Sequence, residues 1–363
     1  MDASPAAVAQ AEAENAINNA DIPDEQNDED MKRVAKIAAR SAVLVVTHPL
    51  AMLKTLFQLG FEPYPLSQGK TLVVAGRDAY FLPNLFAYGR NLTEELGFMV
   101  LYSGFEANLF ASCTSRFVNA EIKKYIDKYY PELGGSSALE PKEPEKVQEE
   151  ELNENTEESF RVMIRSAMRS TVVNWVGIVV SRPFTVLMVR QIGQLIGGEL
   201  KYYGLIPSML RIGREEGPAG YFSGLVPALI AEAVQIWGVH TLIWTIERGI
   251  VHADKNGMFE DNEHGRSAKK GARKLTKLLA PFAINAYSYP FQVVSTVMAT
   301  IGSGLAVSML PYAPSFGMWQ NAYTYLKPNG GLKRGARMFL REQAGAISVG
   351  NDRLLYANYK HFA

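Results

Sequence analysis

The feature that most constrains this chain is a run of 49 residues, 278–326, without any aspartate, glutamate, lysine or arginine. Across the whole chain 20% of residues are charged. A soluble domain must cover its surface with polar groups and rarely contains such a run. A bilayer core, in contrast, requires about 20 apolar residues per helix. We therefore expect residues 274–301 to span a membrane, and the glycine- and proline-containing residues after them to form a loop or a shallow helix.

Further candidate spans contain some charges. They lie at residues 42–59, 105–126, 171–192 and 225–246. A charge at the centre of a membrane helix costs about 2.5–3.5 kcal/mol, so such side chains usually face a bundle interior or a watery cavity. The segment 105–126 is the weakest candidate, because it carries five charged residues. Together the segments predict an all-α membrane protein with five spans. A soluble all-α protein with buried helices is the alternative.

The charges are strongly segregated. Residues 1–30 carry nine acids and no base, and residues 131–160 carry ten acids and two bases. Since the net charge of the chain is zero, the other 303 residues carry a net charge of +17. We expect a disordered acidic segment at 1–30 and a solvated acidic loop insert at 127–160. The first residues have the pattern of neither a secretory signal nor a cleavable mitochondrial presequence.

No pattern of catalytic or metal-binding residues stands out. The single cysteine, Cys113, excludes a disulfide framework and any multi-cysteine metal site. The five histidines lack paired metal-ligand spacing. The glycines at 193–198 are not followed by the Lys-Ser/Thr of a phosphate-binding loop. We expect no enzyme activity, no cofactor and no metal. The basic cluster within 269–277 suits anionic lipid better than nucleic acid.

A hydroxyl-x-Pro tripeptide recurs in three of the candidate helices. Its prolines are Pro49, Pro183 and Pro290, which lie 134 and 107 residues apart. The longer interval contains the acidic insert, so the underlying period is near 100 residues, and a period of this kind indicates internal repeats. A proline inside a helix removes a backbone hydrogen bond and kinks the helix. We therefore expect three equivalent kinked helices.

A second repeated element supports this period. Residues 95–109 align without a gap with residues 215–229, and residues 331–335 form a partial third copy. The sequence thus predicts a first repeat at 34–126, a second at 161–250, a polar loop at 251–273, a truncated third repeat at 274–340 and a tail at 341–363.

These repeats resemble the mitochondrial carrier superfamily, whose three repeats each pair a kinked odd-numbered helix with a short surface helix and an even-numbered helix. The family signature, Pro-x-[Asp/Glu]-x-x-[Lys/Arg], supplies a ring of salt bridges that closes the transport path. Here the three copies read Pro-Leu-Ala-Met-Leu-Lys at 49–54, Pro-Phe-Thr-Val-Leu-Met at 183–188 and Pro-Phe-Gln-Val-Val-Ser at 290–295. Of the six signature charges only Lys54 survives, which argues against ordinary solute exchange.

The chain is most similar to a divergent outer-membrane branch, the mitochondrial carrier homologs, over roughly residues 35–340. The strings that carry this resemblance include His-Pro-Leu at 48–50, Gln-Leu-Gly-Phe-Glu-Pro at 58–63, Arg-Pro-Phe at 182–184, Arg-Glu-Glu-Gly at 214–217, Phe-Ser-Gly-Leu-Val-Pro at 222–227 and Tyr-Pro-Phe at 289–291.

The resemblance implies a multi-pass protein of the mitochondrial outer membrane that inserts α-helical proteins, tail-anchored ones included. The branch is also linked to lipid scrambling, lipid metabolism and the binding of apoptosis regulators. The implied partners are the hydrophobic helices of client proteins, membrane lipids including anionic ones, and apoptosis regulators, but no nucleic acid. A lipid scramblase, a membrane receptor or scaffold, and a divergent solute carrier remain alternatives.

A complete carrier needs a sixth span after Gly335, where 28 residues remain. Their longest charge-free piece, residues 343–351, has nine residues and cannot cross a core of about 30 Å. We therefore predict that the sixth helix is missing. A barrel that lacks one helix opens its polar interior to lipid, where a groove would ease the passage of a polar segment.

The residues expected to line this groove are polar side chains inside or at the ends of the spans. They are Lys54, Glu232, Gln235, Arg190, Gln191, Gln194, Asn285 and Gln292. Gln235 shares a helix face with Glu232, and Asn285 shares one with Gln292. The resemblance adds that the position of Glu232 is acidic in the family and is implicated in insertion.

Each of these residues also has a structural alternative. Lys54 could extend its stem to the interface, and Glu232 could form a buried ion pair with Arg182 or Arg190. His240 is expected to be a satisfied core residue. Interhelical hydrogen bonds would explain the amides equally well. The alternative for the 190–194 group is the solvated end of a span. Arg116 needs a partner if residues 105–126 span the membrane.

Overall fold

The computed structural model describes residues 42–70, 76–130, 156–256, 263–309, 316–328, 330–343 and 345–357. The acidic segment 1–30 and residues 131–155 of the predicted insert lie outside the described residues. The chain divides into two compact units, residues 1–49 and residues 50–363, and each is treated by itself.

The described part of the first unit, residues 42–49, is the opening of a helix that covers Ala42–Leu59. The Thr47 hydroxyl donates to the carbonyl of Val43 at 2.9 Å, one turn earlier. Pro49 lies inside this helix, as predicted, and cannot donate a backbone hydrogen bond. The described part of this helix ends at Leu59, where the apolar composition predicted the end of the span.

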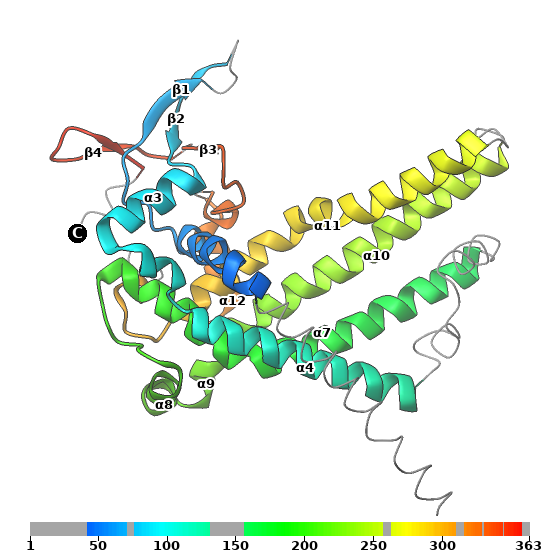
Figure 1. Ribbon diagram of the computed structural model, residues 1–363, viewed down its shortest axis with the longest axis horizontal. Helices are drawn as coiled ribbons and strands as arrows, with labels where there is room; N and C mark the ends of the chain where they lie inside the picture. Colours follow the sequence, from blue (N-terminus) through cyan, green and yellow to red (C-terminus); the bar gives the residue numbers. More distant parts are fainter. Residues whose placement is uncertain are drawn as a thin grey trace, which may run out of the picture. The chain divides into compact units, whose positions relative to one another are not determined.

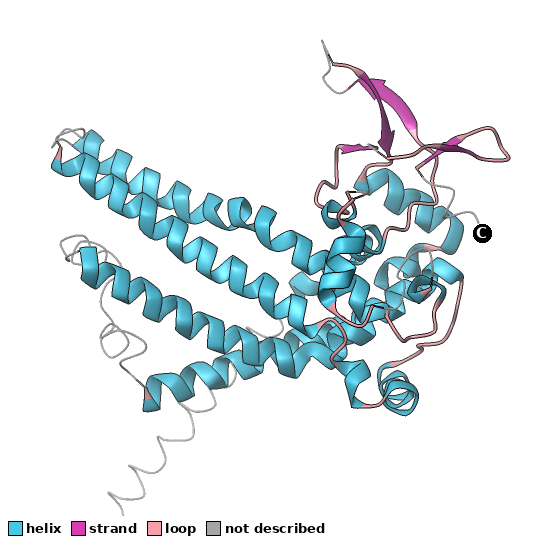
Figure 2. Cartoon of the chain, turned by 180° about the vertical axis from the view of Figure 1, so that it is seen from behind, coloured by secondary structure: helices cyan, strands magenta, loops and turns pink. Residues whose placement is uncertain are grey.

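Four long helices dominate the described part of the second unit. They are α4 (Phe105–Tyr129), α7 (Thr156–Gly193), α10 (Leu225–Lys255) and α11 (Glu263–Thr300). Figures 1 and 2 show α4 beside α7 and α10 beside α11, and α7 also contacts α10. Pro183 and Pro290 lie inside α7 and α11, as the repeat predicted.

Three helices in the described part of the chain are long and apolar enough to cross a membrane: Ala42–Leu59, Thr156–Gly197 and Pro218–Asp254. The other two predicted spans, α4 and α11, have 25 and 38 residues but are less apolar. Large apolar side chains point away from the protein interior, including Phe117 on α4 and both Phe282 and Tyr287 on α11, at 68%, 72% and 71% exposure. Such a surface suits contact with lipid, so the chain is an all-α membrane protein.

The long helices extend beyond their apolar parts. We expected a polar loop at 251–273, but α10 continues to Lys255 and α11 begins at Glu263, so that prediction is wrong. The lysines, arginines and glutamates there are good helix formers, and Lys269 of α11 forms an ion pair with Asp254 of α10. α7 likewise starts at Thr156, 15 residues before the predicted 171.

Shorter helices connect the long ones. The α-helices are α3 (Leu85–Leu96), α8 (Leu205–Glu216), α9 (Pro218–Tyr221) and α12 (Trp319–Leu326); the 3-10 turns are η1 (Phe98–Tyr102), η3 (Gln194–Gly197), η4 (Ala306–Ser308) and η5 (Gly331–Lys333). The short elements η4 and α12 after α11 match the predicted loop or shallow helix.

The structure reproduces the repeat found in the sequence. The helices α3 and α8 both have 12 residues, and each is followed by a glycine with positive φ, Gly97 at 83° and Gly217 at 68°. Gly104 and Gly224, at 75° and 66°, then precede α4 and α10. Only glycine adopts these angles without strain. The two glycines of each repeat therefore set where its surface helix ends and its spanning helix begins.

Of five short strands among the described residues, three lie after Gly335, where a sixth helix would be expected, and two lie in the first repeat. β1 (Ser67–Lys70), β2 (Asp78–Leu82) and β3 (Arg341–Glu342) form an antiparallel sheet in that order, with Phe81 opposite Glu342. β4 (Ser348–Val349) pairs with β5 (Leu355–Tyr356). The described residues after Lys333 contain no helix, in agreement with the prediction that the sixth span is missing.

Candidate functional site

Glu232 lies at the centre of a polar ladder that joins three helices. Its carboxylate accepts a hydrogen bond from Asn174 Nδ2 of α7 at 2.8 Å. The amide of Asn119 on α4 lies 3.4 Å from Asn174 Oδ1. All three side chains are half-buried, so solvent or a ligand can reach them. The polar ladder (Asn119, Asn174 and Glu232) therefore places accessible polar groups between otherwise apolar spans.

A glycine on α7 makes room for this ladder. A Cβ at Gly177 would lie 2.0 Å from Asn119 Oδ1, so a larger residue there would displace the amide. In the other orientation of its amide, Asn119 donates to the carbonyls of Ser115 and Val173 at 3.2 and 2.9 Å. In either orientation, Asn119 holds α4 close to α7.

The structural alternative for Glu232, a buried ion pair with Arg182 or Arg190, is wrong. Arg182 is buried and donates to the carbonyl of Ser223 at 2.5 and 3.0 Å, ahead of α10. Arg190 pairs instead with Glu216. Both arginines are thus engaged elsewhere, and the described contact of the Glu232 carboxylate is with a neutral amide.

Gln235 extends the polar lining from α10 to α11. Its amide Nε2 donates to the carbonyl of Pro281 at 3.0 Å, and its Oε1 accepts from the Ser288 hydroxyl at 2.9 Å. Gln292 Nε2 approaches Ser288 Oγ at 3.5 Å and Asn285 Oδ1 at 3.4 Å. The structure therefore brings Gln235, Asn285 and Gln292 together.

The polar lining continues to the first helix, residues 42–59. The Thr296 hydroxyl of α11 donates to Gln58 Oε1 at 2.9 Å, and Gln58 Nε2 lies 3.5 Å from the Tyr289 hydroxyl. The ammonium of Lys54 lies 5.3 Å from the centroid of the Tyr289 ring, within the range of a cation–π contact. Lys54 is half-buried, so it fits neither complete burial nor full extension into solvent.

Several members of this lining were not predicted from the sequence. They are Asn119, Asn174, Ser288, Thr296 and Gln58. Asn174 carries the clearest signal that was available, because it is the one side-chain amide within the charge-free residues 170–181. The serine and threonine gave no usable signal, since a hydroxyl can bond its own helix backbone.

Arg190 does not lie on this polar lining. Its side chain is fully buried, and it forms an ion pair with Glu216, with Nη2 and Oε2 2.8 Å apart. Its Nε donates to the carbonyl of Ala299 at 2.9 Å and its Nη2 to that of Ile301 at 3.3 Å. Arg190 therefore fixes α7 to the end of α11 and to the end of α8.

Gln194 and Gln191 also differ from the expectation. Gln194 holds the main chain of Tyr202, accepting from its N–H at 2.9 Å and donating to its carbonyl at 3.3 Å. Gln191 is buried, and its Oε1 has no hydrogen-bond partner among the described residues. Within the predicted polar patch at 190–194, Arg190 and Gln194 thus hold segments of the protein together instead of lining a path.

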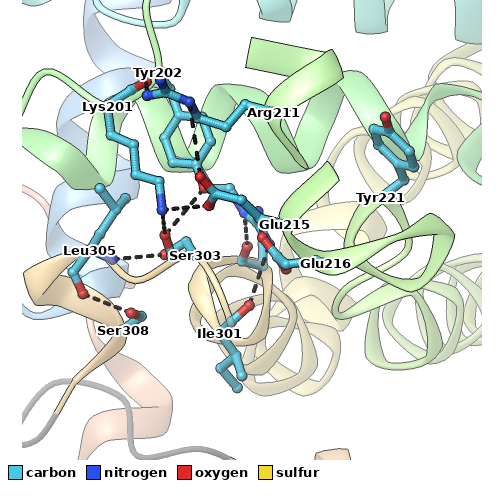
Figure 3. Close-up of polar contacts among 12 residues, drawn as sticks. Lys201, Tyr202, Arg211, Glu215, Glu216, Tyr221, Ile301, Ser303, Leu305 and Ser308 are labelled. Carbon is cyan, nitrogen blue, oxygen red and sulfur yellow. Dashed lines mark hydrogen bonds and ion pairs between the residues drawn. The ribbon is translucent and has the colours of Figure 1, made fainter. Parts of the chain in front are cut away.

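Further contacts fasten the same end of the helices, and Figure 3 shows how they converge on Ser303. Lys201 Nζ donates to the Ser303 carbonyl at 2.7 Å and pairs with Glu215 at 2.6 Å. The Tyr202 hydroxyl donates to the same carbonyl at 3.3 Å. Burial raises the pKa of Tyr202, so its hydroxyl stays protonated and remains a donor.

A pocket of about 200 Å³ lies between α7 and α10, eight residues along each helix from Asn174 and Glu232. Here Ser166 Oγ lies 3.4 Å from His240 Nε2, while His240 Nδ1 lies 2.8 Å from the Ile236 carbonyl. His240 therefore has contacts at both ring nitrogens, but it is half-buried and lines the pocket, so it does not lie in the core as expected. In the described residues no group of three potential ligands could hold a metal ion.

Two residues of α4 with chemical interest are exposed. Arg116 has an exposed side chain and forms no ion pair within the described part of the chain, so the expected partner was not found. Cys113 is an exposed free cysteine.

Comparison with known proteins identifies relatives across most of the chain. Mitochondrial carrier homolog 2 of Mus musculus is 27% identical over 308 residues, which cover 85% of this chain and 93% of that protein. Mitochondrial carrier homolog 1 of the same organism is 27% identical over 311 residues, covering 84% and 75%. The chain is thus similar to the mitochondrial carrier homologs over most of its length.

Other relatives show the same similarity. The human mitochondrial carrier homolog 2 is 28% identical over 308 residues, covering 85% of this chain and 93% of that protein. No protein-family model matches the chain. The similarity to mitochondrial carrier homologs and the apolar helices together support a mitochondrial membrane protein. Among its described residues, no ion pair links the three proline-containing signature segments.

Proposed function

We propose that this protein is a multi-pass insertase of the mitochondrial outer membrane for α-helical proteins, including tail-anchored ones. The observation that carries the proposal is the polar ladder, in which Asn174 of α7 donates to Glu232 of α10 and half-buried Asn119 bonds α4 to α7 in either amide orientation. Polar groups in a membrane are costly, and they commonly mark a path for a polar or charged cargo.

The proposed mechanism lowers a transfer barrier without covalent chemistry. A client helix is stable once it lies in lipid, but its charged flank costs about 2.5–3.5 kcal/mol per charge at the bilayer centre. Each hydrogen bond within a membrane is worth roughly 1–2 kcal/mol. The amides and the carboxylate of the lining, together with Lys54, would offset part of this cost at successive depths.

The lack of a helix among the described residues beyond Lys333 supports lateral access to such a lining. In a six-helix ring that helix would stand between the first and the fifth, here α11. The described residues beyond Lys333 form short strands instead of a helix. A client helix could therefore leave the lining sideways into lipid without opening a closed ring.

Insertion of a tail-anchored reporter into liposomes that carry the purified protein tests this proposal. We expect Glu232→Arg to reduce the insertion rate about tenfold, because one lost polar contact of about 1.4 kcal/mol corresponds to that factor. Lys54→Glu should also change the rate. Glu158→Gln, at an exposed site near the start of α7, is the matched control and should leave it unchanged.

The outcomes separate the candidate functions. Insertion above that of empty liposomes, reduced by Glu232→Arg in a folded protein, supports the mechanism. Insertion that neither variant changes would remove the lining from it. If the protein inserts nothing but moves a fluorescent phospholipid between leaflets, the same lining would serve scrambling. Substrate-dependent solute uptake would instead favour a divergent carrier, which the lost signature charges argue against.

A further inference from the structure

The pocket between α7 and α10 has a chemistry that the proposed insertion path does not use. Its walls combine hydroxyl groups, an imidazole, an indole and two opposite charges. The polar and aromatic residues are Ser159, Ser166, His240, Trp244, Glu247 and Arg248. Its volume of about 200 Å³ can hold a small polar group, but not a helix.

The position of the pocket indicates what could reach it. It lies near the start of α7, which begins at Thr156, and toward the end of α10, which ends at Lys255. Trp244 donates from its indole nitrogen to Ser159 Oγ at 3.2 Å, and its ring lies 5.2 Å from that of Phe160. Tryptophan is enriched where membrane helices meet the lipid headgroups. A place near these helix ends and beside a tryptophan is typical of headgroup depth.

The two charges of the pocket select the kind of headgroup. Glu247 and Arg248 are neighbours in the chain and both line the pocket, so its wall is neutral overall but divided into a negative and a positive part. A headgroup with a phosphate and an ammonium group matches both parts. A headgroup with only negative charge would contact Arg248 but would also face the carboxylate of Glu247.

We propose that this pocket binds the headgroup of a zwitterionic phospholipid. Arg248 would contact the phosphate, and Glu247 with the face of Trp244 would contact the ammonium group. His240 is held in place by Ser166 and by the Ile236 carbonyl, which gives the pocket a fixed inner wall. The lipid would remain beside the helices as a bound ligand, so this proposal does not depend on insertion activity.

The experiment uses the full chain in vesicles with equal amounts of phosphatidylcholine and phosphatidylglycerol, each carrying a photoactivatable group next to the headgroup. After irradiation, labelled peptides are located and the ratio of the two lipids is measured. We expect phosphatidylcholine to predominate on peptides from α7 and α10. Label spread evenly along all spans, or equal labelling by both lipids, would overturn the proposal.

Charge variants make the test specific. Glu247→Gln should shift the ratio toward phosphatidylglycerol by about tenfold, because a charged contact is lost only for the zwitterion. Arg248→Gln should lower labelling by both lipids at this pocket. Glu121→Gln, at an exposed position on α4, is the control and should change nothing. Since the readout is a ratio, a general loss of folding would not imitate the shift produced by Glu247→Gln.

A client helix is the competing occupant. If a tail-anchored client protein added before irradiation removes the lipid label from the pocket and is itself crosslinked there, the pocket belongs to the insertion path and the proposal is wrong. If the label persists, the proposal stands. An insertion assay on the same vesicles reports separately on the proposed function.

Discussion

Replacing Arg190 by glutamine should strongly destabilise the protein. The guanidinium is fully buried, pairs with Glu216 and donates to the carbonyls of Ala299 and Ile301 at 2.9 and 3.3 Å. Removing one partner of a buried ion pair costs about 3–5 kcal/mol, because the other charge is left without compensation. At roughly 2 °C per kcal/mol for a chain of this size, the Tm should fall by about 6–10 °C. Circular dichroism during heating of the purified protein in detergent micelles measures this change.

Three variants separate the buried charge from other effects. Arg214→Gln, at an exposed site on α8, is the matched control and should change the free energy of unfolding by less than about 0.5 kcal/mol. The double change Arg190→Met with Glu216→Met should cost less than Arg190→Gln alone, because no charge then remains buried. A Tm of Arg190→Gln within about 1 °C of the wild type, or a double variant that is the least stable of all, would refute the reasoning.

Three further predictions concern other parts of the molecule. Burial raises the pKa of Glu62 despite its ion pair with Arg341. A raised folded-state pKa gives stability that is present below the ordinary pKa of glutamate and is lost as the pH rises through the folded-state pKa. The destabilisation by Arg341→Gln, about 3 kcal/mol at pH 7, should therefore shrink between pH 7 and pH 5 in denaturant titrations. A difference in stability that does not change with pH would contradict this. Gly224→Ala should lower stability by about 2 kcal/mol or more, because its φ is +66° and the new Cβ would lie 2.5 Å from a carbonyl oxygen, whereas Gly249→Ala meets nothing within 4 Å and should be neutral or stabilising in the same melts. Cys113 should react slowly with a charged thiol reagent in liposomes and rapidly after solubilisation in denaturant, since α4 is predicted to lie in lipid; rapid labelling in liposomes would speak against α4 as a span.

The starts of α4 and α10 were predictable from the sequence, and the starts of α7 and α11 were not. α4 and α10 begin at Phe105 and Leu225, where the sequence alignment placed them, because a glycine with positive φ directly precedes each. α7 begins far earlier than the apolar pattern suggests. Apolar length reports only the part of a helix inside the membrane, while charged residues such as glutamate and arginine continue the helix outside it.

The candidate site was predictable where its residues lie close together in the sequence. Glu232 with Gln235, and Asn285 with Gln292, were paired by helical spacing, and the structure links Gln235 to this second pair through Ser288. Arg190 was misplaced because its partners come from segments 26, 109 and 111 residues away. A polar residue at the end of a span has the same local pattern whether it lines a path or fastens two helices.

β3 was not foreseen at all, because a strand of two residues has no periodicity to detect. Its partner β2 lies in the first repeat and carries only five residues. The pairing depends on segments that approach each other only in the folded protein, so sequence patterns within either segment do not reveal it.

The pairing of β3 with β2 has a consequence for how the protein is made. Arg341 and its partner Glu62 are 279 residues apart, so Glu62 is synthesised long before the cation that compensates it. At about 5–20 residues per second, translation of the intervening chain takes roughly 15–60 s. Throughout that time the carboxylate lacks this partner and the β2 edge is open to wrong pairing. The first repeat therefore needs protection, by a chaperone or by the membrane, until the last part of the chain has been synthesised.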